Sequence, residues 1–279
     1  MSATDTAGGT ITQYTDPMCT WCWGSEPVVR HLRAAYGEQI QFEYVMGGLV
    51  EDFETFYDAA NDISQPSDVV PHWESASEAH GMPVDTSIFE TDPAQSTYPA
   101  SVAFVAARQQ DRRDAHRYLR ALREAYATEA RNVSRREAQV ALAERVGIDV
   151  TAFEQALDDG TARERFESDL ARTREAGVRA FPTYRVSGPE GERVAAGFQS
   201  YDQLRAALEA VAPSAEPADP PSVREFVGEF GPVATQEVAE TCELARGKAR
   251  QVLQSLHDEG AVGRDPRGNG VFWDSRRDS

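Results

Sequence analysis

A pair of cysteines, Cys19 and Cys22, constrains this chain more than any other feature, because it lies where an extended segment gives way to a helical one. Residues 11–15 are typical of a strand, and residues 23–36 carry apolar side chains at helical spacing. A Cys-x-x-Cys pair at such a junction indicates a dithiol–disulfide centre. Since the first N–H groups of a helix stabilise an anion, we expect Cys19 to become a thiolate more readily than an ordinary thiol.

The spacing predicts a separate role for each cysteine. Cys19 would be the nucleophile, and Cys22, one helical turn further on, would resolve the mixed disulfide that Cys19 forms with a partner. Half of a zinc site is one alternative, but such a site needs four ligands, and the only other cysteine is Cys242, with no Cys-His pair near it. Packing of two inert thiols in the core is the other, although such thiols do not usually show this spacing. We therefore expect no metal and no bound cofactor.

The segments around the pair predict an α/β fold. Residues 39–46 alternate apolar and polar side chains, so a second strand follows the helix. Strand, helix and strand with this crossover length form a βαβ unit with parallel strands. Residues from about 50 to 176 show helical periodicity and predict a large all-helical insertion. Residues 181–196 then predict a hairpin and residues 201–211 a last helix, which completes the order βαβ, helical insertion, ββα.

A proline-rich linker at residues 213–221 predicts a boundary between two domains, the first spanning residues 10–212 and the second residues 222–275. In the second, three helical segments precede a predicted hairpin, an order typical of a winged helix-turn-helix. DNA binding is conceivable, but winged helices also serve as protein docking modules, and we favour docking. The basic residues that would contact phosphates are Arg246, Lys248 and Arg250 on the presumed recognition helix, and Arg264 and Arg267 in the wing.

The charge of the chain limits its partners. The formal net charge is -18, and Lys248 is the only lysine among 28 basic residues. Self-repulsion of this strength is tolerated where salt screens it, so we expect a halophilic protein. It also disfavours binding of the whole chain to nucleic acid or to an anionic membrane. The sequence shows neither a leader nor an apolar run of membrane-spanning length, so we expect a cytoplasmic protein, in which a dithiol is catalytic or redox-sensing.

Five motifs together resemble the DsbA-type branch of the thioredoxin superfamily, and more closely the FrnE-like predicted protein-disulfide isomerases. They are DPMCTWCWG at residues 16–24, MGGL at 46–49, HWESASEAHGMP at 72–83, DPAQSTYPAS at 92–101 and GVRAFPTYRV at 177–186. The similarity runs from residue 11 to about residue 212. It implies a thioredoxin-like core with a large helical insertion, to which this chain adds a small C-terminal domain.

The resemblance also implies roles for particular residues. Pro182 would follow a cis peptide bond and would turn the backbone of Phe181 toward the dithiol, where it could pair with an extended substrate. From the residues alone, Pro182 can also open a strand in the trans form. Asp16 could relay a proton for the dithiol or hold an Asp-Pro turn. Trp21 and Trp23 could cover the disulfide and contact a substrate, or simply pack in the core.

The predicted function is that of a thiol-disulfide oxidoreductase or protein-disulfide isomerase, with protein or low-molecular-weight thiols and disulfides as substrates. Thr-Trp stands between the cysteines where DsbA has Pro-His, so the direction of electron flow stays open, as does the oligomeric state. A redox-responsive regulator is one alternative, in which the dithiol controls DNA or protein binding by the C-terminal domain. A glutathione-dependent isomerase of the 2-hydroxychromene-2-carboxylate isomerase type is another, but those enzymes carry serine in place of Cys19.

Overall fold

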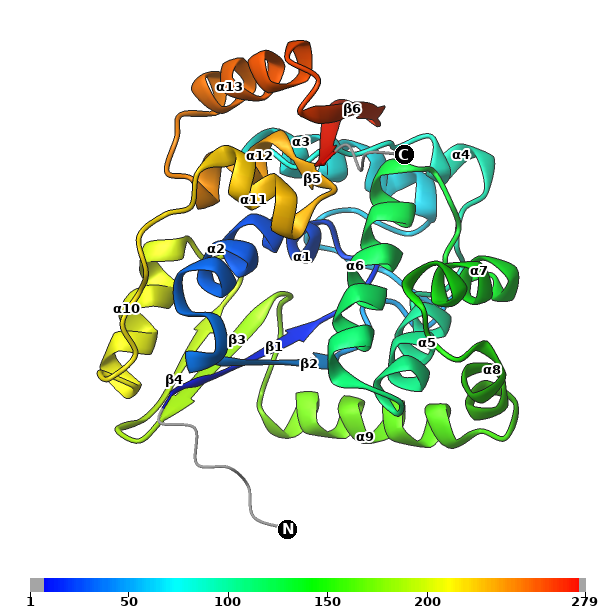
Figure 1. Ribbon diagram of the computed structural model, residues 1–279. Helices are drawn as coiled ribbons and strands as arrows, with labels where there is room; N and C mark the ends of the chain where they lie inside the picture. The colour runs from blue at the N-terminus through cyan, green and yellow to red at the C-terminus, as the bar shows by residue number, and fades with distance from the viewer. Residues whose placement is uncertain (1–7, 276–279) are drawn as a thin grey trace.

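The computed structural model describes residues 8–275 and contains a four-stranded sheet in the order β2–β1–β3–β4 (Figure 1). β1 (Thr10–Thr15) pairs in parallel with β2 (Gln41–Met46) and antiparallel with β3 (Thr183–Gly188). β3 in turn pairs antiparallel with β4 (Gly191–Ala196). The predicted α/β fold, with its βαβ and ββα units, is confirmed.

The helix expected over residues 23–36 is divided into α1 (Thr20–Gly24) and α2 (Glu26–Tyr36). The division falls at Ser25, whose hydroxyl donates a hydrogen bond to the carbonyl of Cys22 at 2.7 Å. Pro27 follows in the first turn of α2, where the absence of its N–H costs nothing. The short helix α1 therefore contains little besides the second cysteine and its neighbours. A single turn of 3-10 helix, η1 (Gly37–Gln39), connects α2 to β2.

The segment between β2 and β3 is largely helical, as predicted, but its first part, residues 47–65, forms turns and one isolated bridge between Asp58 and Ile63. None of the helices in the described chain is long and apolar enough to cross a membrane. The elements of the insertion are η2 (Pro66–Val69), α3 (Val70–His80), α4 (Ile88–Thr91), α5 (Tyr98–Arg108), α6 (Arg112–Thr128), α7 (Arg136–Val146), α8 (Val150–Asp158) and α9 (Thr161–Glu175).

The insertion covers the outer edge of the sheet at β2, which would otherwise present unpaired backbone groups. The carboxylate of Asp169 on α9 accepts a hydrogen bond from the backbone N–H of Met46 at 3.0 Å. Arg108 on α5 donates to the carbonyl of Tyr44 at 2.8 Å and pairs with the same Asp169 carboxylate at 2.9 Å. Side chains of the insertion thus form hydrogen bonds to the edge of β2 that a fifth strand would otherwise form.

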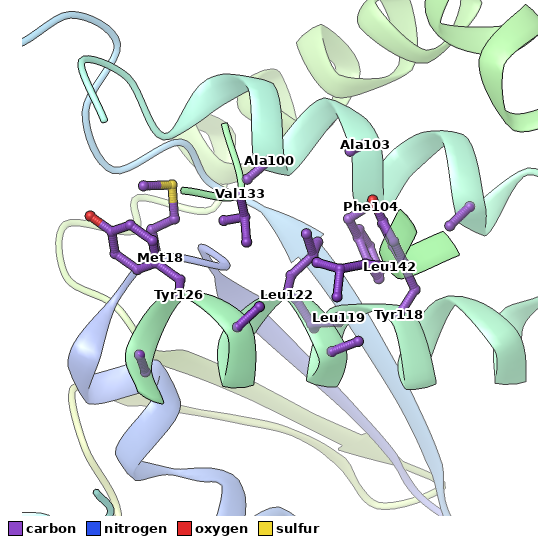
Figure 2. Packing of buried hydrophobic residues seen from close by; sticks show 14 of the residues in the cluster. Met18, Ala100, Ala103, Phe104, Tyr118, Leu119, Leu122, Tyr126, Val133 and Leu142 are labelled. Atoms are coloured by element: carbon purple, nitrogen blue, oxygen red, sulfur yellow. The ribbon is translucent and has the colours of Figure 1, made fainter. Parts of the chain in front are cut away.

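The helix α6 is fixed by apolar side chains at helical spacing (Figure 2). These buried residues are Tyr118, Leu119, Leu122 and Tyr126, and they share one cluster with Ala100, Ala103 and Phe104 of α5 and with Val133 and Leu142. Burial of a large apolar side chain contributes about 1.5–3 kcal/mol. Met18, next to the first cysteine, belongs to the same cluster. The packing therefore holds α6 in a fixed position relative to the cysteine turn.

The C-terminal segment follows α10 (Tyr201–Val211) and has a hydrophobic cluster of its own, which includes Phe226, Val238, Leu253 and Trp273. Its sheet has the order β5–β7–β6. Its elements are α11 (Val223–Phe230), β5 (Val233–Ala234), α12 (Thr235–Thr241), α13 (Arg246–Asp258), β6 (Val262–Arg267) and β7 (Gly270–Ser275). The domain boundaries and the assignment to the winged-helix class stay predictions.

The proline-rich stretch at residues 213–221 lies along the first part of the chain rather than standing free of it. The N–H of Ala218 donates to the carbonyl of Ala35 at 2.7 Å. Glu216 and Gln39 exchange two hydrogen bonds, of 2.9 and 3.0 Å. The segment predicted to be a stiff spacer is therefore held against the first part of the chain by hydrogen bonds.

The hairpin of β6 and β7 also contacts the helical insertion. Asn269 and Val84 exchange two hydrogen bonds, of 2.9 and 3.0 Å, through the Asn269 side chain and its backbone. Arg267 lies 3.3 Å from both Glu124 and Glu129. Arg267 would contact phosphates if the C-terminal segment bound DNA through its wing. In the structure it instead forms ion pairs with Glu124 and Glu129, near the end of α6. The C-terminal segment lies over α1, α2 and α3 as a consequence (Figure 1).

Candidate functional site

Cys19 and Cys22 lie at the start of α1, as expected. Cys19 is the N-cap residue, and its Sγ accepts a hydrogen bond from the backbone N–H of Cys22 at 3.3 Å. Both cysteines are free thiols. Cys22 is fully buried, whereas 5% of Cys19 is exposed. Of the two, Cys19 is the one that a substrate sulfur can approach, which supports its predicted role as the nucleophile.

The peptide bond between Phe181 and Pro182 is cis and lies beside Cys19, as the resemblance implied. The Cys19 thiol donates a long hydrogen bond, 3.8 Å, to the carbonyl of Phe181. Gly47 lies against this segment, and a Cβ atom at Gly47 would stand only 2.0 Å from the Phe181 ring. Glycine at this position therefore allows the close approach of Phe181, a role that the sequence did not reveal.

The buried carboxylate of Asp16 holds three segments together at the end of β1. Its Oδ1 accepts a hydrogen bond from the N–H of Met18 at 2.8 Å. Its Oδ2 accepts from the N–H of Leu49 at 2.9 Å, from the Thr97 hydroxyl at 2.7 Å and from the Ser101 hydroxyl at 3.4 Å. Burial raises the pKa of this carboxyl, although these hydrogen bonds oppose the shift. Its bonded partners favour the turn-holding interpretation over a proton relay.

Of the two thiols, Cys22 is the one whose pKa the surroundings lower. Burial raises the pKa of the Cys22 thiol, but the hydrogen bond from Cys19 and the charge of Arg123 bring that pKa below its usual value. The pKa of Cys19 is raised well above its usual value, first by its hydrogen bond to Cys22 and then by burial. The expectation that Cys19 becomes a thiolate more readily than an ordinary thiol stays a prediction, and these two directions run against it. The N-terminus of a helix favours the Cys19 anion, whereas the hydrogen bond from Cys19 and then the positive charge of Arg123 favour the Cys22 anion.

That cation, Arg123 on α6, is completely buried. Its guanidinium forms an ion pair with Glu26 at the start of α2 and donates a hydrogen bond to the hydroxyl of Thr15 on β1. Burial by itself raises the pKa of Glu26, yet the charges of Arg123 and Arg120 lower it to about 2. Sequence analysis missed this pair, because its members are far apart in the chain and neither belongs to a recognisable motif.

The ion pairs continue from the site to the C-terminal segment. Arg120 lies 3.3 Å from Glu26 and 2.6 Å from Glu124, and it pairs with Glu237 of α12 at 2.8 Å. Arg30 of α2 contacts the same Glu237 at 2.6 Å. Glu237 is completely buried, as is Arg123. The C-terminal segment therefore supplies one carboxylate, Glu237, to the network of ion pairs that includes Arg120 and Glu26.

The two tryptophans predicted at the site lie in different surroundings. Trp21 is 39% exposed, and its ring lies 5.8 Å from the ring of Phe198, which is also 39% exposed. Trp23 is buried, donates to the carbonyl of Pro83 at 2.8 Å and stacks on Phe272 of β7. Trp21 can contact a substrate, whereas Trp23 packs in the core and against the C-terminal segment.

The third cysteine, Cys242, ends α12 and packs against the C-terminal hydrophobic cluster. Burial raises the pKa of its thiol to about 11, so it is a poor nucleophile at neutral pH. Among residues 8–275, no three or more His, Cys, Asp or Glu side chains are placed to hold a metal ion.

A histidine that sequence analysis did not single out as a site residue, His80, makes the stability depend on pH. It accepts a hydrogen bond from the N–H of Met82 at 3.0 Å and lies 3.4 Å from the Thr20 hydroxyl, and burial lowers its pKa to about 4. The unfolded chain binds this proton more tightly than the folded chain does. The contribution of neutral His80 to the free energy of unfolding is therefore fully present above pH 6.5 and is lost as the pH drops toward 4, by up to about 3 kcal/mol. Urea unfolding of wild type and His80→Gln should show a flatter pH profile for the variant. A pH profile of His80→Gln as steep as that of the wild type would contradict the assignment.

Comparison with known proteins places the fold in context. A family model described as thioredoxin matches residues 13–206. A candidate protein disulfide isomerase from Nitrosomonas europaea has a similar structure, with a TM-score of 0.61 and 21% identity over 72% of this chain and 96% of that one. The cytosolic disulfide reductase DsbM from Pseudomonas aeruginosa has a TM-score of 0.55 and 20% identity over 72% of this chain and 93% of its own. These likenesses show the fold.

The curated relatives carry a different name. The ClpXP adapter protein SpxH of Halalkalibacterium halodurans is 28% identical over 94% of this chain and 87% of its own length. SpxH of Bacillus subtilis is 26% identical over 95% of this chain and 88% of its own length. The family model supports the thioredoxin-like fold, whereas the narrower expectation of a protein-disulfide isomerase finds no counterpart in the names of these relatives. Because the match to SpxH of Halalkalibacterium halodurans covers 94% of this chain, it includes part of the C-terminal segment.

Proposed function

The chain belongs to the thioredoxin family, and from that premise we propose that it is a thiol-disulfide oxidoreductase that works through a mixed disulfide on Cys19. The observation that carries the proposal is the geometry of the dithiol. Cys19 caps α1 and keeps a small exposed fraction, Cys22 lies fully buried one turn further on, and the cis Phe181–Pro182 segment lies beside Cys19. This arrangement provides an accessible nucleophile, a protected second thiol and a backbone that a substrate can pair with.

The proposed reaction transfers two electrons in two exchange steps. The thiol proton of Cys19 passes to the charged Cys22 sulfur, and the Cys19 thiolate attacks one sulfur of the substrate disulfide. The substrate S–S bond breaks, a bond from Cys19 to the substrate forms, and the departing thiolate takes a proton from solvent. Cys22 then loses its proton and attacks Cys19, which forms the internal disulfide and releases the second substrate thiolate. The reverse sequence oxidises a dithiol substrate.

The surface around Cys19 suits an extended or apolar substrate segment. The aromatic rings of Trp21 and Phe198 are half exposed and lie close together. Leu49, whose N–H is held by Asp16, is 41% exposed. We propose that these side chains contact the residues that flank a substrate cysteine, while the backbone of Phe181 pairs with the substrate main chain.

A second candidate function is protein binding in the manner of an adapter, alone or under control of the dithiol. The similarity to the SpxH adapters extends into the C-terminal segment, and that segment is joined to the site by the ion pairs of Glu237 and by the contact between Trp23 and Phe272. The contacts of Arg267 and Asn269 with the helical insertion support docking over DNA binding. A pull-down of partners by the reduced and the oxidised protein distinguishes simple adapter binding from binding under control of the dithiol. A redox-controlled adapter should release its partners in one of the two states, whereas a simple adapter should bind them equally in both.

The oxidoreductase proposal is tested by turnover of insulin disulfides with glutathione or dithiothreitol as electron donor. We expect the wild-type protein to accelerate the reaction and the double variant Cys19→Ser/Cys22→Ser to fall to the uncatalysed rate, because both exchange steps need a thiolate. Equilibration of the wild-type protein with glutathione buffers would also give the reduction potential and hence the direction of electron flow. Equal rates for the double variant and the wild type would refute the proposal.

A further inference from the structure

A cleft of about 730 Å³ lies between α2, α6 and the C-terminal segment, and neither cysteine of the dithiol lines it. Seven arginines line this cleft, against four glutamates. The chain as a whole has a net charge of -18, so a local excess of positive charge is unexpected. Arginines that gather in a concave site in an acidic protein need either carboxylate partners or an external anion.

Several of these arginines have partners within the protein. Arg30 and Arg120 are neutralised by the buried carboxylate of Glu237 and its neighbours. Arg267 pairs with Glu124 and Glu129 at 3.3 Å. These groups form the inner wall of the cleft and serve to dock the C-terminal segment.

Arg33 differs from them, because it has no carboxylate partner among residues 8–275. Its guanidinium instead donates to Nδ1 of His116 at 3.0 Å, contacts the hydroxyl of Tyr44 at 3.4 Å and lies 5.0 Å over the ring of Phe42. Its Nε is buried and has no hydrogen-bond partner. Burial, together with the charge of Arg33, lowers the pKa of His116 to about 3, so this histidine is neutral and cannot balance the guanidinium.

Two further arginines of the lining are bound only weakly. Arg117 pairs with Asp114 one turn earlier, and 62% of its side chain is exposed. Arg145 of α7 lies 3.5 Å from Glu129, a carboxylate that it shares with Arg267. Exposed ion pairs of this kind are weak, so an incoming anion can replace them at little cost.

We propose that this cleft binds a small phosphate-bearing anion, with Arg33 as the principal contact and Arg117 and Arg145 as additional contacts. The guanidinium fork matches phosphate oxygens in two parallel hydrogen bonds, and the volume is that of a small-molecule site. A phosphate group carries nearly two charges and several acceptor oxygens, which suits Arg33 and its two weakly paired neighbours better than a single carboxylate does. Because Phe230, Pro232 and Arg267 also line the cleft, the bound anion contacts both the core and the C-terminal segment.

The test is isothermal titration calorimetry of the full chain with inorganic pyrophosphate, at the lowest salt concentration at which the protein stays folded. We expect saturable binding to one site, and Arg33→Gln should weaken it at least 10-fold. The control is Arg205→Gln, which changes an arginine on α10 that pairs with Glu209 outside the cleft and should alter the affinity less than 2-fold. Should Arg33→Gln fail to fold by circular dichroism, the double variant Arg117→Gln/Arg145→Gln should show a loss of at least 5-fold.

Parallel titrations with citrate and with hexaglutamate identify the chemistry of the ligand. Pyrophosphate that binds more tightly than either, with the expected loss in Arg33→Gln, supports the proposal. Tighter binding of citrate or of the acidic peptide would overturn the assignment to phosphate. Absence of saturable pyrophosphate binding, or equal losses in Arg33→Gln and Arg205→Gln, would overturn the site itself. None of these outcomes depends on the oxidoreductase activity.

Discussion

Replacing Cys22 with serine is expected to convert the protein into a trap that accumulates covalent complexes with its substrates. Cys19 can still attack a disulfide in this variant, but the buried thiol that releases the partner is missing, so multiple turnover should fall at least 100-fold. Cys19→Ser should lose turnover to the same extent and form no covalent complex, because the remaining Cys22 is fully buried. The complexes are counted on non-reducing gels after incubation with a disulfide substrate, and their attachment site is read by mass spectrometry.

The chain offers a matched control in Cys242. Its thiol is half-buried with a raised pKa, and it lies in the C-terminal hydrophobic cluster. Cys242→Ser should therefore leave both turnover and complex formation unchanged. Complexes that form on Cys19→Ser through Cys22 would reverse the proposed order of attack. That result would mean that the lowered pKa of Cys22, rather than the exposure of Cys19, decides which sulfur reacts.

Removal of the buried cation beneath the dithiol should have the largest effect on stability. Arg123→Met keeps much of the side-chain volume but leaves the largely buried Glu26 carboxylate without its main partner. Breaking a buried ion pair from one side costs about 3–5 kcal/mol. We expect the free energy of unfolding, measured with urea at pH 7, to fall by about that amount. The loss should be smaller at pH 3, since a Glu26 without Arg123 regains a more ordinary pKa and can be neutralised by a proton.

The double variant Glu26→Gln/Arg123→Met tests the cause of that loss. It removes both charges, and we expect it to recover at least half of the stability lost in the single variant. Arg136→Met, which changes an exposed pair with Asp158, should cost less than about 0.5 kcal/mol and serves as the control. If the double variant is no more stable than Arg123→Met, then Arg123 stabilises the fold through the packing of its guanidinium rather than through its charge.

Much of the fold could be predicted because its signals are local. The alternation of residues 39–46, the helical periodicity from about residue 50 to residue 176 and the turn before residues 193–196 depend only on neighbours in the sequence. The boundary at Ser25 could not be predicted in this way. It depends on one hydroxyl that bonds to the carbonyl of Cys22, and apolar periodicity continues across it.

The candidate site could be predicted only in part, for a related reason. The cysteine turn is contiguous in sequence, and Phe181 and Pro182 were found through a resemblance of motifs. Arg123 and Glu26 are single charged residues on amphipathic helices, and in the sequence they look like any solvated residue of such a helix. Their importance follows from burial, which no pattern of charges reveals.

The sequence by itself therefore determined which sulfurs react, because two cysteines one helical turn apart at a strand-to-helix junction have few other uses. Only the tertiary structure decided which charged groups surround them. It brings Arg123 from α6 to the buried side of Cys22 and balances it with Glu26, whose network extends to Glu237 of the C-terminal segment. The physical reason is that Coulomb energies depend on separation in space and on the local dielectric, and neither quantity is encoded in the separation of residues along the chain.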